Sequence, residues 1–157
     1  TGSAFALSGC GFKLRKAPEL AFKSLYVNAQ GTSPFGNEIR RNLTALGDLT
    51  VIDDPKAQAS ADVILDILAE GREKTVVGVN TSGQVREFQL RTRMRFRLRT
   101  PQGKELIAPT ELLLQRDISF NESAVLAKEA EEGLIYRDMQ SDLVQQLLRR
   151  LAAVKAL

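Results

Sequence analysis

Residues 90–99 read Leu-Arg-Thr-Arg-Met-Arg-Phe-Arg-Leu-Arg, with an arginine at every second position and no interruption. Successive side chains of a β-strand point to opposite faces of the sheet, so this period of two predicts a strand with one apolar and one cationic face. The apolar face holds Leu90, Met94, Phe96 and Leu98, and the cationic face holds Arg91, Arg93, Arg95, Arg97 and Arg99. The cationic row is about 26 Å long, with neighbouring residues about 6.6 Å apart.

The rest of the chain supplies partners for such a strand. Long strands are predicted over residues 62–79, 84–100 and 104–120, because Asn80-Thr81-Ser82-Gly83 and Pro101-Gln102-Gly103 between them carry hairpin chemistry. Shorter strands are predicted over 24–28 and 49–52.

Two helices are predicted around these strands. Ile39, Leu43 and Leu46 recur at helical spacing before Gly47. From about Asn121 the pattern turns helical again, with a candidate core stripe and a break or kink at Gly133. The stripe comprises Leu134, Met139, Leu143, Leu147, Leu151 and Val154, with Leu148 beside it. We therefore expect an α+β fold, a two-layer sandwich in which two helices pack on one mostly antiparallel or mixed sheet of about four to five strands.

The five arginines would repel one another unless anionic groups lie among them. One hypothesis is a structural ladder with carboxylates of neighbouring strands, namely Asp62, Asp66 and Glu70 on one side and Glu111 and Asp117 on the other. The alternative is a ligand with phosphates or carboxylates, which guanidinium groups bind in a two-pronged way.

The amino terminus carries a lipidation signal. Leu7-Ser8-Gly9-Cys10 matches the bacterial lipobox and follows the apolar run Ala4-Phe5-Ala6. This motif predicts a diacylglycerol on Cys10, and buried acyl chains supply membrane affinity. No aspartate follows Cys10, which favours the outer membrane over retention at the inner membrane.

This signal also sets the expected domain organisation. Residues 1–9 are interpreted as the end of a signal peptide or, for Thr1-Gly2, as residues added for expression. Residues 10–22 are expected to form a lipidated leader and residues 23–157 a single α+β domain. The sequence has no run of 18 apolar residues that would predict a membrane span.

The composition argues against an enzyme. The sequence contains no histidine and one cysteine, so histidine-dependent catalytic triads, thiolate metal clusters and intrachain disulfides are excluded. We therefore predict no catalytic residues, no metal site and no cofactor other than the covalent lipid on Cys10. Nucleic acid is not an expected partner in the envelope, where lipopolysaccharide is the abundant polyanion.

Three stretches resemble the LptE family of lipopolysaccharide-assembly lipoproteins. They are the lipobox running into Cys10-Gly11-Phe12-Lys13-Leu14-Arg15, the Leu126-Ala127-Lys128 turn, and the terminal run from Asp142 to Leu151. The order of strands and helices between them also fits that family, whose fold is a small sheet with two helices packed on it.

The resemblance implies a lipid-anchored protein of the outer membrane, on its periplasmic side and in a barrel lumen. There it would plug the β-barrel LptD, help that barrel to assemble, and bind lipopolysaccharide. It places one lipopolysaccharide contact on Lys128 and a second basic contact in the hairpin loop before the middle strand. Here that loop, residues 79–83, has no basic residue. Either Arg86 and the row Arg91, Arg93, Arg95 and Arg97 take over this contact, or lipopolysaccharide binding is weaker than the family role implies.

Two other functions are compatible with the same residues. The chain could be a structural envelope lipoprotein whose arginines are neutralised within the protein, or a periplasmic lipoprotein for another anionic envelope ligand. Charge-neutralising changes at Arg93, Arg95 and Arg97 would distinguish the first of these from a lipopolysaccharide-binding plug.

Overall fold

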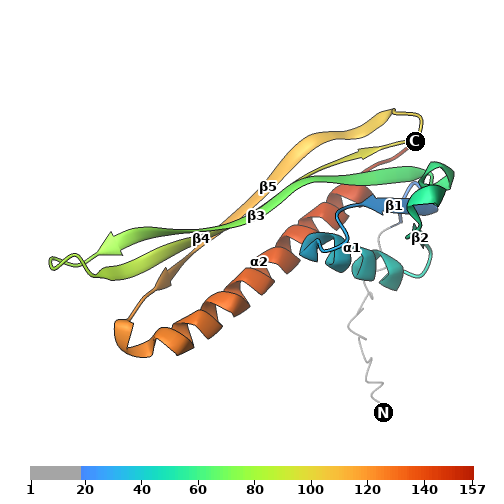
Figure 1. The fold of residues 1–157 in the computed structure, drawn as a ribbon. Helices are drawn as coiled ribbons and strands as arrows, with labels where there is room; N and C mark the ends of the chain where they lie inside the picture. Colours follow the sequence, from blue (N-terminus) through green and yellow to red (C-terminus); the bar gives the residue numbers. More distant parts are fainter. Residues whose placement is uncertain (1–18) are drawn as a thin grey trace, which may run out of the picture.

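The computed structural model describes residues 19–157, in which five strands form one open sheet with two α-helices against it (Figure 1). The strands are β1 (Ser24–Asn28), β2 (Thr50–Ile52), β3 (Val63–Val79), β4 (Val85–Arg99) and β5 (Glu105–Ser119). The helices are α1 (Pro34–Ala45) and α2 (Val125–Ala152), and the short 3-10 helices η1 (Pro55–Ser60) and η2 (Glu122–Ala124) precede β3 and α2. The predicted α+β fold class is confirmed, whereas Cys10 and its motif lie outside the described residues.

The sheet has the order β2-β1-β3-β4-β5. β1 runs parallel to both β2 and β3, while β3, β4 and β5 form an antiparallel meander. Because β1 pairs only with the first residues of β3, the hairpin of β3 and β4 extends far beyond the two short strands (Figure 1). The fold is therefore elongated, with α2 running along β4 and β5.

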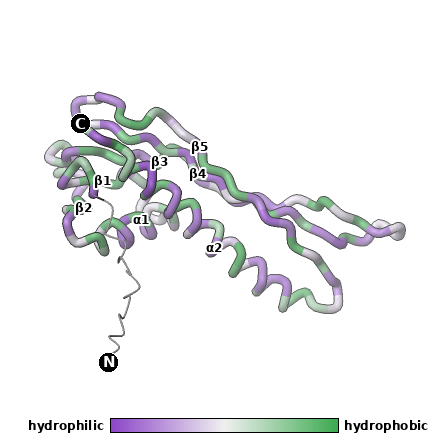
Figure 2. Tube along the Cα trace, turned by 180° about the vertical axis from the view of Figure 1, so that it is seen from behind, coloured by the Kyte–Doolittle hydropathy of each residue, from purple (hydrophilic) through white to green (hydrophobic). Residues whose placement is uncertain are grey.

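The core lies between the sheet and the two helices. Met94, Phe96 and Leu98 of β4 are fully buried, as the alternation predicts, and they share one cluster with Leu143 and Leu147 of α2. Ile39 and Leu43 of α1 complete this cluster on the side of the parallel strands. Figure 2 colours the chain by hydropathy, and the residues that alternate between hydrophilic and hydrophobic are those of β4. Burial of one strand face and one helix stripe thus fixes which side of β4 faces the core.

The first helix begins with a side-chain cap. Ser33 Oγ accepts a hydrogen bond from the Gly36 amide at 2.8 Å, and Pro34 occupies the first helical turn, where no amide donor is needed. The same hydroxyl donates to Glu70 Oε2 of β3 at 2.6 Å. One serine therefore both starts α1 and ties it to the sheet.

Two expectations for the last helix are wrong. Gly133 does not end or break α2, which is one continuous helix, and Leu134 is 55% exposed and does not join the core stripe. Leu134 stands five residues before Met139, a spacing that turns it to another side of the helix. Ile135 and Tyr136 take the inward positions and pack with Met139 in a second apolar cluster.

A β-bulge interrupts the longest strand. The pairing of β3 with β4 shifts between Ile67 and Ala69, so Leu68 is the extra residue. Asp66 lies opposite Arg97, but beyond the bulge Glu70 lies opposite Met94 and Glu73 opposite Arg91. The bulge thus reverses which residues of β3 share a face with the arginines.

Candidate anion-binding face

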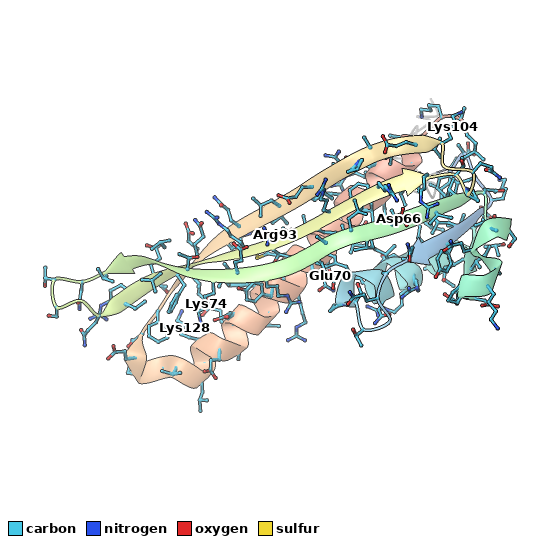
Figure 3. All side chains as sticks on the ribbon, turned by 45° about the horizontal axis from the view of Figure 1, so that its top comes forward. Asp66, Glu70, Lys74, Arg93, Lys104 and Lys128 are labelled. Atoms are coloured by element: carbon cyan, nitrogen blue, oxygen red, sulfur yellow. The ribbon has the colours of Figure 1, made fainter. Side chains whose placement is uncertain are left out.

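The arginine row lies on the side of the sheet away from α1 and α2. We call this side of β3, β4 and β5 the open face. Figure 1 shows both α-helices on the other side, and Figure 3 shows where Arg93 lies on the middle strand. Arg91, Arg93 and Arg95 are exposed, whereas Arg97 and Arg99 are partly buried. The row therefore has an accessible half and a sheltered half.

In the sheltered half, one carboxylate binds both arginines and balances one of their two charges. Asp66 Oδ2 accepts hydrogen bonds from Arg97 Nε and Arg99 Nε, each at 2.7 Å, and its side chain is 5% exposed. Asn28 donates to Asp66 Oδ1 at 2.7 Å. Burial by itself would raise the pKa of Asp66, but the hydrogen bonds from Arg99, Asn28 and Arg97 and the Arg99 charge outweigh it and lower the pKa. Arg97 and Arg99 therefore stabilise the fold through Asp66.

The accessible half is neutralised only in part. Arg93 Nη2 lies 3.4 Å from Glu73 Oε1, and both side chains are about half exposed. Arg91 Nε donates to Gln89 Oε1 at 2.9 Å, a neutral partner. Arg95 faces Glu111 in the register, but neither Arg91 nor Arg95 forms a salt bridge within residues 19–157. An exposed pair such as Arg93–Glu73 contributes little energy and leaves the guanidinium group accessible.

The full cross-strand ladder of acids is therefore not formed. Glu70 is turned to the helix side by the bulge at Leu68, where it accepts from Ser33, and Asp62 accepts from the amides of Lys23 and Ser24. Asp117 faces Gln89, which donates to it at 3.1 Å. Glu73, which the sequence did not single out, replaces Glu70 beside the row.

Lys128 lies apart from the arginine row. It stands in the first turn of α2 at the far end of the sheet, where its Nζ contacts Glu131 Oε2 at 2.8 Å and Ser119 Oγ at 3.2 Å. Figure 3 shows Lys128 near Lys74 and away from Arg93. The structure thus separates the predicted contacts into two groups, one on the open face and one at the start of α2.

Lys74 is a basic residue at this end that the sequence did not single out. Its Nζ lies 2.6 Å from Glu132 Oε2 and 4.3 Å from the centre of the Phe88 ring. Lys74 and Lys128 border a cavity of about 220 Å³ with an apolar lining of Phe88, Ile118, Phe120 and Val125. Lys74 faces α2 only because of the bulge at Leu68, which no local sequence signal revealed.

The open face provides a cationic surface that a polyanion can contact. Guanidinium groups present forked donors for phosphate and carboxylate oxygens, and three exposed ones lie in a single row. Leu113 of β5, which is 49% exposed, lies opposite Arg93 on the same face. The open face therefore carries an exposed leucine side chain beside its exposed arginines.

No helix within residues 19–157 has the length and hydropathy that crossing a membrane requires.

These features define a class of protein, a two-layer α+β domain with helices on one side of its sheet and a row of cations on the other. Residues 22–151 match the family model LptE, described as lipopolysaccharide-assembly. The chain belongs to the LptE family, as the sequence resemblance predicted.

Relatives named as LPS-assembly lipoproteins align with most of the chain. The LPS-assembly lipoprotein LptE of Yersinia enterocolitica is 31% identical over 95% of this chain and 71% of its own length. That of Pectobacterium atrosepticum is 26% identical over 94% of this chain and 79% of its own length.

Solved structures share the fold. Uncharacterized lipoprotein B from Nitrosomonas europaea superposes with a TM-score of 0.77 at 36% identity, covering 91% of both chains. The rare lipoprotein B from Shewanella oneidensis gives a TM-score of 0.69 at 18% identity, over 83% of this chain and 95% of that chain, which concerns the fold alone.

Proposed function

We propose that this chain is a non-catalytic outer-membrane lipoprotein that plugs the β-barrel LptD, helps it to assemble, and binds lipopolysaccharide. Membership of the LptE family implies a role in lipopolysaccharide transport. The single observation that carries the binding proposal is the exposed half of the arginine row, Arg91, Arg93 and Arg95, which the protein's own carboxylates neutralise only in part. Anchoring through a lipid on Cys10 is part of the same proposal.

The surface chemistry supports a plug. The lumen of a large membrane barrel is polar, so a plug needs a charged outer surface and an internal core of its own. Here the apolar residues of β4 are buried against α2 and the arginines face outward. The phosphates of lipopolysaccharide could therefore contact Arg91, Arg93 and Arg95 without any rearrangement of the hydrophobic core.

Arg97 and Lys128 differ from the three exposed arginines in this account. Arg97 is engaged by buried Asp66, and we assign it a supporting role with weaker contact to the ligand. Lys128 is engaged by Glu131 in an i,i+3 pair whose side chains are 22% and 47% exposed, and a phosphate could displace the carboxylate. Lys128 would therefore act as a separate contact at the start of α2.

A structural lipoprotein that binds no lipopolysaccharide is the second candidate. The observation in its favour is that Asp66 already binds Arg97 and Arg99 within the fold. It predicts that neutralising Arg91, Arg93 and Arg95 leaves all activities of the protein unchanged.

The test of the plug is co-purification from the native host. The tagged full-length precursor would be expressed, the outer membrane solubilised gently, and bound proteins quantified. We expect the LptD barrel in equimolar amounts. Recovery of lipidated protein without any barrel would contradict the proposal.

A further inference from the structure

Within residues 19–157, no strand lies beside the backbone groups on the outer edge of β5. β5 is the terminal strand of the sheet and is paired on one side only, with β4. The Phe120 amide donates to the Arg86 carbonyl at 2.8 Å. In an antiparallel strand, every second residue directs its amide to the same neighbouring strand. Counting back from Phe120, the amides of residues 112, 114, 116 and 118 therefore point to β4. Those of residues 111, 113, 115 and 117 therefore point to the free edge.

Most of this edge lacks two of the usual protections against strand pairing, proline and bulges. Natural edge strands are commonly blocked by proline, bulges or inward charges, and the one inward charge here is Arg116, which pairs with Asp142. In β5 the proline, Pro109, lies at the irregular end, where the pairing shifts between Phe96 and Leu98. Residues 110–119 contain neither proline nor glycine and pair with β4 in unbroken register. A strand of about ten residues is therefore available for pairing.

A small cavity adjoins the same edge on the helix side. It has a volume of about 140 Å³ and lies between β5 and α2, with Ile135 and Met139 in its lining. Asp138 and Asp142 of α2 border it at i,i+4 spacing. Arg116 Nη2 lies 3.7 Å from Asp142 Oδ2, whereas Asp138 forms no salt bridge among the described residues. The cavity is thus lined by an apolar part, by the carboxylates of Asp117, Asp138 and Asp142, and by one cation, Arg116, so its carboxylates are in excess.

We propose that the β5 edge binds an extended segment of a partner protein as a sixth strand, with a lysine or arginine side chain in this cavity. Strand addition takes its affinity from main-chain hydrogen bonds and its specificity from pockets for alternate side chains. The aliphatic stem of a basic side chain suits Ile135 and Met139, and its charged end suits Asp138. The added strand lies beyond β5, so Arg91, Arg93 and Arg95 on the open face stay accessible.

A second copy of this chain fits the edge poorly. The only basic residue of β5 is Arg116. An antiparallel β5–β5 pair centred on Arg116 would set the two Arg116 side chains against each other. Like charges directly opposite one another on paired strands are destabilising. A different protein can carry its basic residue at a strand position next to, and not opposite, Arg116, so the charge pattern favours such a partner.

The test uses the full chain and a synthetic peptide of about nine residues, a length that covers β5 from Glu111 to Ser119. The probe alternates threonine and valine and carries one central lysine, and the matched peptide has glutamate instead. We expect the lysine peptide to bind about tenfold more tightly. Hydrogen exchange should slow at the amides of Leu113, Gln115 and Asp117.

Two variants separate the backbone from the cavity. Gln115→Pro removes an amide that points to the free edge and leaves the ladder with β4 intact, so it should abolish binding, whereas Gln115→Thr should not. Asp138→Asn, on the surface of α2, should remove the preference for lysine over glutamate while keeping the exchange protection. If Gln115→Pro fails to fold, the effect of Asp138→Asn on the preference for lysine still tests the proposal.

Three outcomes would overturn the inference. They are equal binding of the lysine and glutamate peptides, protection of β3 amides instead of β5 amides, and concentration-dependent self-association through β5. None of them bears on lipopolysaccharide binding by the open face, so the two proposals fail independently.

Discussion

Arg99 Nε donates to Asp66 Oδ2 at 2.7 Å, across two neighbouring strands of the open face. The Asp66 side chain is 5% exposed and that of Arg99 20%, so this contact is partly shielded from solvent. It divides the arginine row into a half that stabilises the fold and a half that is available to a ligand.

Removing the charge of Asp66 should destabilise the fold. In Asp66→Asn, Arg97 and Arg99 keep their charges and lose their shared partner, which should cost about 2–3 kcal/mol of unfolding free energy. Urea denaturation of the variant and the parent measures this difference. Glu111→Gln, an exposed acid on the same face, is the control and should cost below about 0.5 kcal/mol. Equal effects at the two positions would contradict the structural role of Asp66.

The same carboxylate should make stability depend on acid pH. The pKa of Asp66 in the folded chain is lowered from its ordinary value of 3.8, so the folded state stays ionised to lower pH than the unfolded chain. Its contribution to stability is thus fully present above the ordinary aspartate pKa and is lost as pH falls through the lowered pKa. Urea denaturation between about pH 6 and pH 3 should show the gap between parent and Asp66→Asn narrowing with acid. A gap that is constant across this range would argue against the lowered pKa.

Thr92 offers a stabilising change. It is fully buried on the core face of β4, and its hydroxyl has no hydrogen-bond partner among residues 19–157. Thr92→Val replaces the hydroxyl by a methyl group of similar shape and should stabilise the fold by about 1 kcal/mol. Thr92→Ser, which keeps the hydroxyl and removes the methyl group, should destabilise it. Thermal unfolding of the two variants distinguishes these effects, and a less stable valine variant would show that the hydroxyl is satisfied.

Ser33 should matter more than an ordinary helix cap. Its hydroxyl caps α1 at Gly36 and donates to Glu70, and Ser33 is 5% exposed. Ser33→Ala should cost about 1–2 kcal/mol, because it removes the cap of α1 and the hydrogen bond that links this helix to Glu70 of β3. Ser60→Ala, which removes an exposed hydroxyl bonded to Ala57, is the matched control and should cost little. A loss at Ser33 no larger than at Ser60 would refute the joint role.

The periodic parts of this fold could be predicted from the sequence. The strand over residues 24–28 was predicted with the bounds that β1 has, and the buried face of β4 followed from its alternation. Both predictions rest on the local sequence of a strand. In β4 the period of two in hydrophobicity follows from the burial of one face of the strand.

The parts that were missed depend on tertiary pairing. A single extra residue, Leu68, reverses the faces of β3, so Glu70 was placed on the arginine side and Glu73 was not singled out. Leu134 was assigned to the core because apolar residues recur nearby, but its spacing to Met139 turns it outward. Lys74 and Lys128 approach one another only because β3 and α2 come together at the far end of the sheet.

Lipopolysaccharide binding is proposed to depend on the exposed arginines Arg91, Arg93 and Arg95. The most direct measurement is the affinity for purified lipopolysaccharide of a triple variant, Arg91→Gln, Arg93→Gln and Arg95→Gln. A second triple variant, Arg137→Gln, Arg149→Gln and Arg150→Gln, removes the same charge from exposed positions on α2. We predict at least about a tenfold loss for the open-face variant and little change for the α2 variant, with binding that weakens as salt is raised. Equal affinities for both variants and the parent protein would contradict the claim and support the purely structural role of the row.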